Sequence, residues 1–289
     1  MKCGFVAIVG KPNVGKSSLL NKIIDYDLAI ISSMAQTTRN VIRGIYNDKD
    51  SQIIFIDTPG YFKSPTKLSD FINSSITKTI KNDVELVLYV FEALKPIEIL
   101  ESINLNFDKT IALITKIDLF KNDRELEEYV IQIKQLGFRH VVGVSIEIQD
   151  SIKTLINTIK EFLPISPPFY DQNELTDVPI NFIIQEQIRL SVIKSIDKEI
   201  PHNVAVLVEE YTPAKESEKA MIRAIIYCAK ESQKGILIGK SGQMIKKIRM
   251  FAQKKIEFIL GIGTYLDLKV KVKKKWMNDI NKIKELLSY

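Results

Sequence analysis

Residues 10–17 read GKPNVGKS, a glycine-rich segment that matches Gly-x-x-x-x-Gly-Lys followed by Ser or Thr. The apolar run Phe5–Val9 precedes this segment, and a helical pattern over Ser17–Ile24 follows it. A glycine loop between a strand and a helix turns backbone N–H groups and the positive helix end toward a phosphate. In this setting Lys16 is expected to reach the β- and γ-phosphates, and the Ser17 hydroxyl to bind Mg²⁺. The segment therefore predicts a nucleotide phosphate site.

Strand and helix patterns alternate around this loop through the first half of the chain. The expected strands are Phe5–Val9, Ile53–Ile56, Leu86–Val90, Ile111–Ile114 and Val141–Val144. The expected helices are Ser17–Ile24, Lys67–Ile80, Glu125–Leu136 and Ser151–Phe162. This alternation is typical of an α/β doubly wound domain with a mostly parallel sheet, in which ligand sites lie at the carboxyl ends of the strands. We expect this P-loop domain to span residues 1–165.

A second motif, DTPG at residues 57–60, follows one of the expected strands. In this position Asp57 is expected to hold Mg²⁺ through a water molecule, and the backbone N–H of Gly60 to sense the γ-phosphate. The same four residues are also a common turn sequence, so the motif by itself supports either interpretation. Its place behind the phosphate loop favours a role in nucleotide binding.

The strand Ile111–Ile114 leads into Thr115-Lys116-Ile117-Asp118, a motif suited to contacting a base. A carboxylate at Asp118 can accept hydrogen bonds from the N1–H and the N2 amino group of guanine, both of which adenine lacks. Lys116 is expected to lie along the base and the phosphate loop. Ser145 follows the strand Val141–Val144 and fits a last guanine-contacting loop, in which Ile146 would contribute its backbone N–H. The motif alone equally suits a helix entry, but its order and spacing favour guanine.

Three prolines, Pro164, Pro167 and Pro168, end the last helix of the first half and open an expected linker over residues 166–178. Residues 179–289 have a different pattern. They begin with an amphipathic helix and contain three alternating strands and a long helix. The expected order is α-β-β-α-α-β with a final helix, an α+β arrangement that resembles a type II K-homology (KH) domain.

The sequence Gly239-Lys240-Ser241-Gly242 lies between two helical segments of this second half. In a KH domain the glycines of such a loop allow a phosphate backbone to approach, and the adjoining groove holds about four nucleotides. A Gly-x-x-Gly sequence alone indicates only a loop, so the assignment depends on the surrounding element order. The expected phosphate partners are Lys234, Lys240, Lys246 and Lys247.

The charge of the chain is divided unevenly between its two halves. Residues 1–177 hold 20 Lys and Arg against 23 Asp and Glu, whereas residues 178–289 hold 21 against 12. Such an excess favours a polyanionic partner, either nucleic acid or an anionic membrane surface, and it is also compatible with a solvated lysine-rich surface. No helical segment of this half is expected to pair a basic face with bulky aromatic anchors, which disfavours the membrane.

Other classes of protein are disfavoured by composition. Cys3 and Cys228 are the only cysteines, too few for a disulfide framework or a zinc site, and the alternation around Cys228 predicts a core position. No export signal is visible, and no run approaches the roughly 18 apolar residues of a membrane span. We expect a cytoplasmic monomer whose membrane contact, if any, is peripheral.

Together these motifs closely resemble the bacterial Era family of GTPases over nearly the whole chain. The motifs that carry the resemblance are GKPNVGKS, AQTTR at Ala35–Arg39, DTPG, TKID, TDVP at Thr176–Pro179, EIPH at Glu199–His202 and SQKGILIGKSG at Ser232–Gly242. The resemblance implies a P-loop GTPase domain joined to a KH domain. It also implies binding to the 3′ region of small-subunit ribosomal RNA, maturation of the small ribosomal subunit, and some peripheral membrane association.

The resemblance also implies roles for single residues. Thr38 matches the switch residue that completes Mg²⁺ coordination when GTP is bound, and Gln36 and Thr37 would move with it. Thr115 stands where GTPases usually carry Asn and is expected to keep one hydrogen bond. Ile146 replaces the usual Ala. The segment of residues 30–35 is about one residue shorter than the family pattern, and the family's Gly-x-x-Ala-Arg after the KH loop is absent here.

Hydrolysis is expected to be slow, because Tyr61 occupies the position where regulatory GTPases often carry a water-orienting Gln. Asn13 matches the residue that helps to place K⁺ in potassium-activated relatives, and it can equally serve only to shape the loop. Lys16, Thr38, Gly60 and Asn13 are therefore the expected catalytic residues, and Ser17, Thr38 and Asp57 the expected metal ligands.

Taken together, the expected GTP-binding residues are Gly10, Lys11, Pro12, Asn13, Val14, Gly15, Lys16, Ser17, Ser18, Asp57, Thr58, Pro59, Gly60, Thr115, Lys116, Asp118, Ser145 and Ile146. The expected RNA-binding residues are Lys234, Gly235, Gly239, Lys240, Ser241, Gly242, Lys246 and Lys247. Three functions remain compatible with these sites. GTP hydrolysis can time RNA engagement, which we favour; the nucleotide domain can bind GTP with hardly any turnover; or the basic half can serve a membrane.

Overall fold

The computed structural model describes residues 1–32, 34, 37–62, 64–81, 84–100, 103–196, 200–215 and 218–287. Ala35 and Gln36 of the AQTTR motif and Glu199 of the EIPH motif lie outside the described residues. The chain divides into two compact units. The first contains Met1–Ala29, Thr38–Lys63 and Ile72–Asp177, and the second contains Ile30–Thr37, Ser64–Phe71 and Val178–Tyr289. The domain boundaries expected at 165 and 178 stay a prediction.

A six-stranded sheet in the order β2-β3-β1-β4-β5-β6 forms the centre of the first unit. Its strands are β1 (Lys2–Gly10), β2 (Ile42–Asn47), β3 (Ser51–Asp57), β4 (Leu86–Glu92), β5 (Thr110–Thr115) and β6 (His140–Val144). All neighbouring strands run parallel except β2, which pairs antiparallel with β3. The mostly parallel sheet is therefore confirmed, and the phosphate loop, the DTPG motif and the TKID motif all follow carboxyl ends of its strands.

The edge strand β2 was not expected from the sequence. Gly44 lies in its middle, and glycine weakens the alternating pattern by which a strand is recognised. The structure explains this glycine, because a Cβ there would lie 2.8 Å from side-chain atoms of both Leu20 and Ile24. A helix therefore packs closely against β2, and only glycine leaves room for it.

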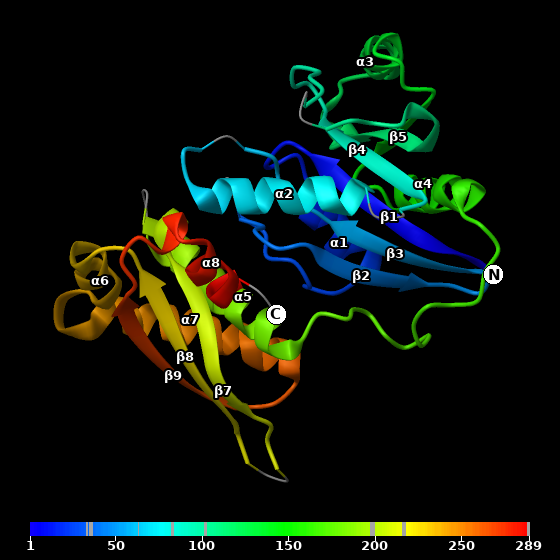
Figure 1. Cartoon of the computed structure of the whole chain (residues 1–289). Helices are drawn as coiled ribbons and strands as arrows, with labels where there is room; N and C mark the ends of the chain where they lie inside the picture. The colour runs from blue at the N-terminus through cyan, green and yellow to red at the C-terminus, as the bar shows by residue number, and fades with distance from the viewer. Residues whose placement is uncertain are drawn as a thin grey trace. The chain divides into compact units, whose positions relative to one another are not determined.

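Helices cover both faces of this sheet (Figure 1). They are α1 (Lys16–Ile24), α2 (Lys67–Lys81), α3 (Asp123–Gln135) and α4 (Gln149–Phe162), with short 3-10 turns at Phe107–Lys109 and Ile117–Leu119. Side chains of α2 and α3 share a buried cluster with Ala7 and Val9 of β1. Helix α1 packs on the opposite face, at Gly44. The four helices expected for this half are confirmed.

Residues 166–177, expected to be part of a linker, are bound along the edge of the first sheet. The backbone N–H of Ile45 donates to the carbonyl of Leu175 over 2.8 Å. The side chain of Gln52 accepts from the backbone N–H of Tyr170 at 3.0 Å and donates to its carbonyl at 2.8 Å. Arg43 forms an ion pair with Asp177 at 2.7 Å. This segment therefore packs as part of the first unit.

The second unit contains a three-stranded sheet in the order β7-β8-β9. Its elements are α5 (Ile180–Ser195), β7 (Ala205–Thr212), β8 (Ala220–Cys228), α6 (Glu231–Ile238), α7 (Gln243–Leu260), β9 (Thr264–Val272) and α8 (Ile280–Leu287), with 3-10 turns at Ile200–Asn203, Lys240–Gly242 and Trp276–Asn278. β7 and β8 are antiparallel, and β8 and β9 are parallel. The expected order α-β-β-α-α-β with a final helix is confirmed.

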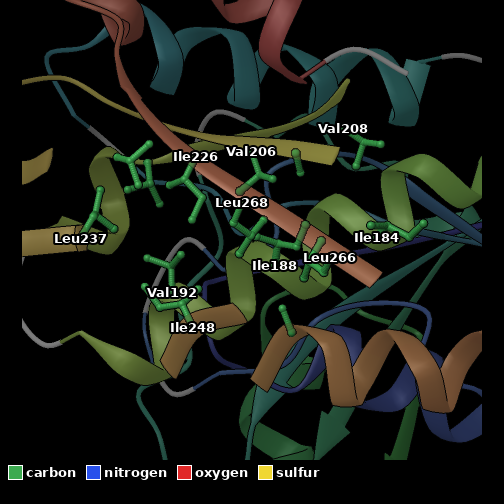
Figure 2. Close-up of a cluster of buried hydrophobic side chains, with 14 of the residues drawn as sticks. Ile184, Ile188, Val192, Val206, Val208, Ile226, Leu237, Ile248, Leu266 and Leu268 are labelled. Atoms are coloured by element: carbon green, nitrogen blue, oxygen red, sulfur yellow. The ribbon is translucent and has the colours of Figure 1, made fainter. Parts of the chain in front are cut away.

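The second unit has its own hydrophobic core (Figure 2). Helices α5 and α7 contribute Ile188 and Ile248 to it, and the strands contribute alternate residues such as Val206, Ile226 and Leu268. These are the periodicities of 3.6 and 2 expected for a helix or a strand with one buried face. Cys228 belongs to this core, as its alternation predicts, and both cysteines are free thiols.

The only tryptophan of the chain, Trp276, is also buried in this unit, and its indole N–H donates to the carbonyl of Asn203 at 3.1 Å. Among the described residues, no helix is both long enough and apolar enough to cross a membrane.

Candidate functional site

The backbone of the phosphate loop takes the conformation that an anion-binding turn requires. Asn13 and Gly15 have φ values of 64° and 95°, so both lie in the left-handed region. Glycine adopts this region at no cost, and asparagine is among the residues that tolerate it. Gly15 caps the N-terminus of α1, so the first free N–H groups of that helix lie at the loop. Asn13 itself is exposed.

Lys16 lies inside this loop. Only 6% of its surface is exposed, and its Nζ donates to the carbonyls of Gly10 at 3.2 Å and Lys11 at 2.8 Å. Burial lowers the pKa of the Lys16 ammonium to about 8, although the nearby charge of Asp57 acts in the opposite direction. By contrast, Lys11 is partly exposed and forms an ion pair with Glu98. The two lysines of the motif therefore differ in environment, and only Lys16 lies within the turn.

Three oxygen-bearing side chains meet beside Lys16. Ser17 Oγ donates to Asp57 Oδ2 at 2.6 Å and lies 2.9 Å from Thr38 Oγ1. Asp57 is fully buried, and burial raises the pKa of its carboxyl group to about 6, against the opposing effects of Lys16 and Ser17. The second carboxylate oxygen, Asp57 Oδ1, has no hydrogen-bond partner among the described residues.

These three residues fit a Mg²⁺ ion. Mg²⁺ prefers oxygen ligands and is usually held by one or two carboxylates together with water and substrate phosphates. A buried carboxylate oxygen without a partner is costly, and a nearby cation would compensate it. Among the described residues, no group of three or more His, Cys, Asp or Glu side chains is arranged to hold a metal ion.

The DTPG motif packs directly against the phosphate loop. A Cβ on Gly60 would lie 2.6 Å from the Cα of Pro12, a separation that real side chains do not tolerate. Thr58 is buried and its hydroxyl donates to the carbonyl of Ile8 at 2.7 Å. The turn is thus held next to the phosphate loop, with Asp57 at the start of the turn and Gly60 at its end. Pro59 is also buried there.

A cavity of about 240 Å³ opens beside the start of α1. Its lining joins residues from the phosphate loop, the TKID motif and the loop after β6, namely Gly15, Ser18, Leu19, Thr115, Lys116, Asp118, Val144, Ser145, Ile146 and Glu147. Seven of these, Gly15, Ser18, Thr115, Lys116, Asp118, Ser145 and Ile146, are residues that the sequence analysis assigned to GTP binding. The carboxylate of Asp118 is exposed, and a base in this cavity would have Asp118 at its edge.

Thr115 connects this cavity to the phosphate loop. Its hydroxyl lies 2.6 Å from the carbonyl of Val14 and 3.0 Å from the carbonyl of Phe91, and its single proton serves one of them at a time. Lys116 lines the cavity in the left-handed conformation, with φ 58°, and its ammonium pairs with Glu92 at 2.7 Å. The sequence did not indicate Glu92, since its partner lies 24 residues away.

The loop Ser145–Ile148 is ordered by Ser151, the third residue of α4. The Ser145 N–H donates to Ser151 Oγ at 3.0 Å, and Ser151 Oγ donates in turn to the carbonyl of Ile148 at 2.6 Å. Ile146 is 40% exposed. Tyr61 is partly buried and packs against the apolar cluster that α2 and α3 form with the sheet.

The GKSG loop of the second unit also depends on glycine. Gly239, Ser241 and Gly242 have φ values of 73°, 49° and 75°. A Cβ on Gly239 would lie 2.7 Å from the Cβ of Met244, so the chain can turn there only without a side chain. Lys240 is exposed at the tip of the loop.

The other residues expected to bind RNA lie on the two helices beside this loop. Lys246 and Lys247 are exposed on the first turns of α7, Lys234 is half-buried on α6, and Gly235 follows it. Within the described part of the chain, none of the lysines at 234, 240, 246 and 247 has a carboxylate partner. The expected residues therefore form one basic, accessible region around a tight turn.

A buried ion pair on α5 was missed at the level of sequence. Arg189 Nε and Nη2 donate to the two carboxylate oxygens of Glu186 at 2.8 and 2.6 Å, and Arg189 is only 2% exposed. Nη2 also donates to the carbonyl of Thr37, which belongs to the same unit. Arg189 Nη1 has no partner among the described residues. The available signal was a Glu and an Arg three residues apart, a spacing that places both side chains on one side of a helix.

Comparison with known proteins places the two units in two families. A family model described as a 50S ribosome-binding GTPase matches residues 5–137, and a KH domain model matches residues 199–277. The GTPase Era of Mycoplasmopsis pulmonis is 44% identical over 285 residues, which cover 96% of this chain and 97% of the relative. The GTPase Era of Carboxydothermus hydrogenoformans is 43% identical, over 96% of this chain and 94% of the relative.

Two solved structures match the whole chain. One is a tyrosine-to-alanine variant of Aquifex aeolicus Era bound to GDP and AlF4⁻, with 28% identity, a TM-score of 0.90 and 99% coverage of both chains. The other is Era in complex with MgGDPNP and nucleotides 1506–1542 of 16S ribosomal RNA, with 29% identity, a TM-score of 0.91 and 99% coverage of both chains. The P-loop domain followed by a KH domain is therefore confirmed as the fold.

Proposed function

The chain belongs to the GTPase Era family, and from this premise we propose that it binds GTP with Mg²⁺ and hydrolyses it to GDP and phosphate. We propose further that it binds small-subunit ribosomal RNA near the 3′ end and acts in small-subunit biogenesis. The observation that carries the nucleotide assignment is the meeting of Lys16, Ser17, Thr38 and Asp57 next to a cavity lined by Asp118.

The phosphates of GTP would lie in the turn formed by residues 10–17. The N–H groups at the start of α1 bind phosphate oxygens, and the Lys16 ammonium exchanges its carbonyl partners for the β- and γ-phosphates. Ser17 and Thr38 would bind Mg²⁺ directly and Asp57 through water, since all three oxygens already lie together. When bound, Mg²⁺ neutralises charge on the phosphate oxygens and favours departure of GDP.

The base would lie in the cavity beside α1. Asp118 would accept from the guanine N1–H and N2 amino group, and the backbone N–H of Ile146 would donate to the base. Thr115 supports this geometry through its hydrogen bond to Val14 rather than by contacting the base. An adenine nucleotide would leave the Asp118 carboxylate without donors, so GTP is preferred.

Turnover is proposed to be slow. Tyr61, at the position where regulatory GTPases often carry a water-orienting Gln, packs against the apolar cluster of the first unit. Stabilisation of the transferred phosphoryl group then rests on Lys16, on the backbone N–H of Gly60 and on the metal.

Dependence on K⁺ is the finer part of the proposal. Asn13 lies exposed at the turn of the phosphate loop, where it can help to hold K⁺ near the β- and γ-phosphates. If so, replacing Na⁺ with K⁺ raises the hydrolysis rate, and Asn13→Ala removes the difference while keeping GTP affinity. A rate that does not respond to the cation would return Asn13 to shaping the loop.

For RNA, the support comes from the GKSG loop and its basic surroundings. The positive φ values at Gly239 and Gly242 allow the tight turn between the two helices, and the nearby lysines supply positive charge for the phosphates. The place of action is proposed to be the cytoplasm, with the protein as a monomer. Peripheral membrane association rests on the family resemblance alone.

One experiment tests the whole proposal. Purified protein is mixed with radiolabelled GTP, Mg²⁺ and K⁺, and phosphate release is followed over a single turnover. In parallel, its affinity for a 3′ fragment of small-subunit ribosomal RNA is measured with GDP and with a non-hydrolysable GTP analogue. Release of phosphate together with RNA binding supports the proposal. Binding of GTP without release would leave a nucleotide-dependent RNA-binding module, and failure to bind RNA would remove the ribosomal role.

A further inference from the structure

Helix α7 carries a second, unassigned surface on the side opposite its buried face. Its inward residues, Ile248, Ala252 and Ile256, are at most 1% exposed and belong to the core. Residues 247, 251, 254 and 258 recur at intervals of four, three and four, so they form one stripe along the outward side of the helix. The stripe alternates in chemistry as Lys, Phe, Lys, Phe.

Both phenylalanines of this stripe are exposed. Phe251 is 49% exposed and Phe258 is 76% exposed. Each has a lysine ammonium near its ring, with Lys247 Nζ 5.8 Å from the Phe251 centroid and Lys255 Nζ 5.9 Å from the Phe258 centroid. These distances are within the range of cation–π interaction. We expected no helix of this half to pair a basic face with bulky aromatic residues, and this expectation was wrong for α7. The stripe contains only four residues, so it does not dominate the composition of the helix.

A pair of large aromatic rings exposed on the surface of a folded unit requires an explanation. Burial of such a side chain in a protein core or an interface is strongly favourable, whereas exposure in water is not. Neither ring belongs to the hydrophobic core of this unit. The charges on the helix narrow the choice of partner, since α7 contains five Lys and Arg residues and Glu257 as its only acidic residue.

We propose that this stripe, Lys247, Phe251, Lys254 and Phe258, is a second RNA-contact surface that extends the GKSG site along α7. The phenylalanine rings stack with unpaired bases, and the lysines contact the neighbouring phosphates. The inference rests on the RNA-binding function proposed above and adds to it the residues that bind RNA beyond the groove.

Continuity with the GKSG loop favours this occupant. Gly242 caps the N-terminus of α7, and Lys247 lies on the second turn of the helix. From Gly242 to Phe258 the helix rises about 24 Å, at roughly 1.5 Å per residue. A KH groove holds only about four nucleotides. A longer RNA that leaves the groove at this end would therefore pass over the stripe.

The alternation of charge and ring also distinguishes RNA from a membrane. A helix that lies on a bilayer keeps its apolar residues together on one face, away from its lysines. Here the apolar face of α7 is already buried in the core, and each exposed ring has a lysine ammonium close to it. Single-stranded RNA presents bases and phosphates in alternation, and proteins bind it by combining basic grooves with aromatic stacking platforms.

The test compares short and long RNA in the full-length protein. The probes are a fragment corresponding to nucleotides 1506–1542 of the 16S ribosomal RNA found with the solved relative and oligonucleotides of about four to six nucleotides from the same region. The double variant Phe251→Ala with Phe258→Ala should bind the long RNA about a hundredfold more weakly, at about tenfold for each lost stack. Its affinity for the short oligonucleotide should equal that of the parent.

Two further variants make the result specific. Phe251→Tyr with Phe258→Tyr keeps both rings and should bind the long RNA like the parent. Tyr265→Ala removes another aromatic ring of the same unit, 51% exposed on β9, and should have no effect on either RNA. If Tyr265→Ala weakened binding as strongly as the double variant, a general effect of losing exposed apolar surface would explain the data and the proposal would fail.

The outcomes separate this inference from the function on which it rests. If the parent does not bind even the short oligonucleotide, the RNA-binding function itself is wrong. If the parent binds the short RNA but gains nothing from the longer one, or if the double variant keeps the gain, the stripe does not contact RNA. Sedimentation with phosphatidylserine vesicles covers the other partner: vesicle binding that is lost in the double variant while the RNA gain persists would assign the stripe to a membrane.

Discussion

Two glycine loops, each followed by a helix, are proposed to bind phosphate in this protein. Lys16 and Asp57 at the first loop are buried, whereas Lys240 in the second is exposed. In the loop of residues 10–17, Lys16 is 6% exposed and donates to two backbone carbonyls, and Asp57 beside it is fully buried. In the loop of residues 239–242, Lys240 is exposed and lacks a carboxylate partner among the described residues. Both loops place residues at positive φ, so their backbones are alike in this respect.

The difference teaches what each loop is suited to do. Charges buried in a low dielectric interact strongly and must be matched group by group, which suits the recognition of one nucleotide in one orientation. Charges exposed to water interact weakly and additively, which suits a long polyanion contacted at many points. A single substitution of a buried charge at the first loop should therefore abolish turnover or nucleotide recognition. Substitutions at the second loop should weaken RNA binding in proportion to the number of contacts removed.

The largest effect is expected from Lys16→Ala. Its loss removes a buried cation from the transferred phosphates, and we expect turnover to fall by about a thousandfold or more. Single-turnover phosphate release measures it. Lys11→Ala is the matched control, since that lysine belongs to the same motif but forms a partly exposed ion pair, and its rate should stay within about threefold. Equal losses in both variants would contradict the distinction between buried and exposed charge.

Arg189→Met tests whether the energetic weight of a charge depends on its burial or on the unit in which it lies. Arg189 is buried, yet it belongs to the same unit as the exposed Lys240. The substitution leaves Glu186 buried without its partner, and breaking such a pair costs about 3–5 kcal/mol of unfolding free energy. Arg223→Met removes an exposed pair with Glu210 and should cost at most about 1 kcal/mol. Urea unfolding followed by the fluorescence of Trp276 reports on this unit alone. Similar costs for the two variants would show that burial is not the deciding variable.

Asp118→Asn tests whether the guanine base is also recognised by individually matched hydrogen-bonding groups. An amide has one acceptor and one donor group in place of two acceptors, so GTP affinity should fall about a hundredfold and preference should move to xanthine nucleotides. Competition binding with GTP and XTP measures both changes. Asp123→Asn provides the control, as an exposed carboxylate at the start of α3 that does not line the cavity. An unchanged GTP affinity in the Asp118 variant would remove it from base recognition.

The smallest effect is expected at the exposed loop. Replacing Lys240 and Ser241 with Asp keeps both glycines and puts negative charge where phosphate approaches, so RNA affinity should fall about tenfold. The dependence of affinity on salt should become shallower, because fewer counterions are released. GTP affinity in the same preparation should be unchanged, since this loop belongs to the other unit. RNA binding that survives unchanged would make the loop a simple helix connector.

The sequence by itself was sufficient where function depends on local backbone chemistry. The phosphate loop, the DTPG turn and the GKSG turn were all located from sequence motifs that contain glycines. The structure places Gly15, Gly239 and Gly242 in the left-handed region and packs Gly60 closely against Pro12. The element order of both units was likewise predicted from periodicity, because buried faces of helices and strands repeat at fixed intervals. The one strand that was missed, β2, contains Gly44, which interrupts that signal.

Only the tertiary structure decided which side chains act together across long sequence distances. The carboxylate of Glu92 pairs with Lys116, the hydroxyl of Thr115 reaches Val14, and the residues expected to form a linker bind the edge strand β2. The sequence did not determine side-chain exposure either, since residue type alone does not distinguish the exposed Phe251 and Phe258 from buried phenylalanines. The physical reason is that local propensity and periodicity extend over a few residues, whereas burial and pairing are set by packing between segments that are distant in the chain.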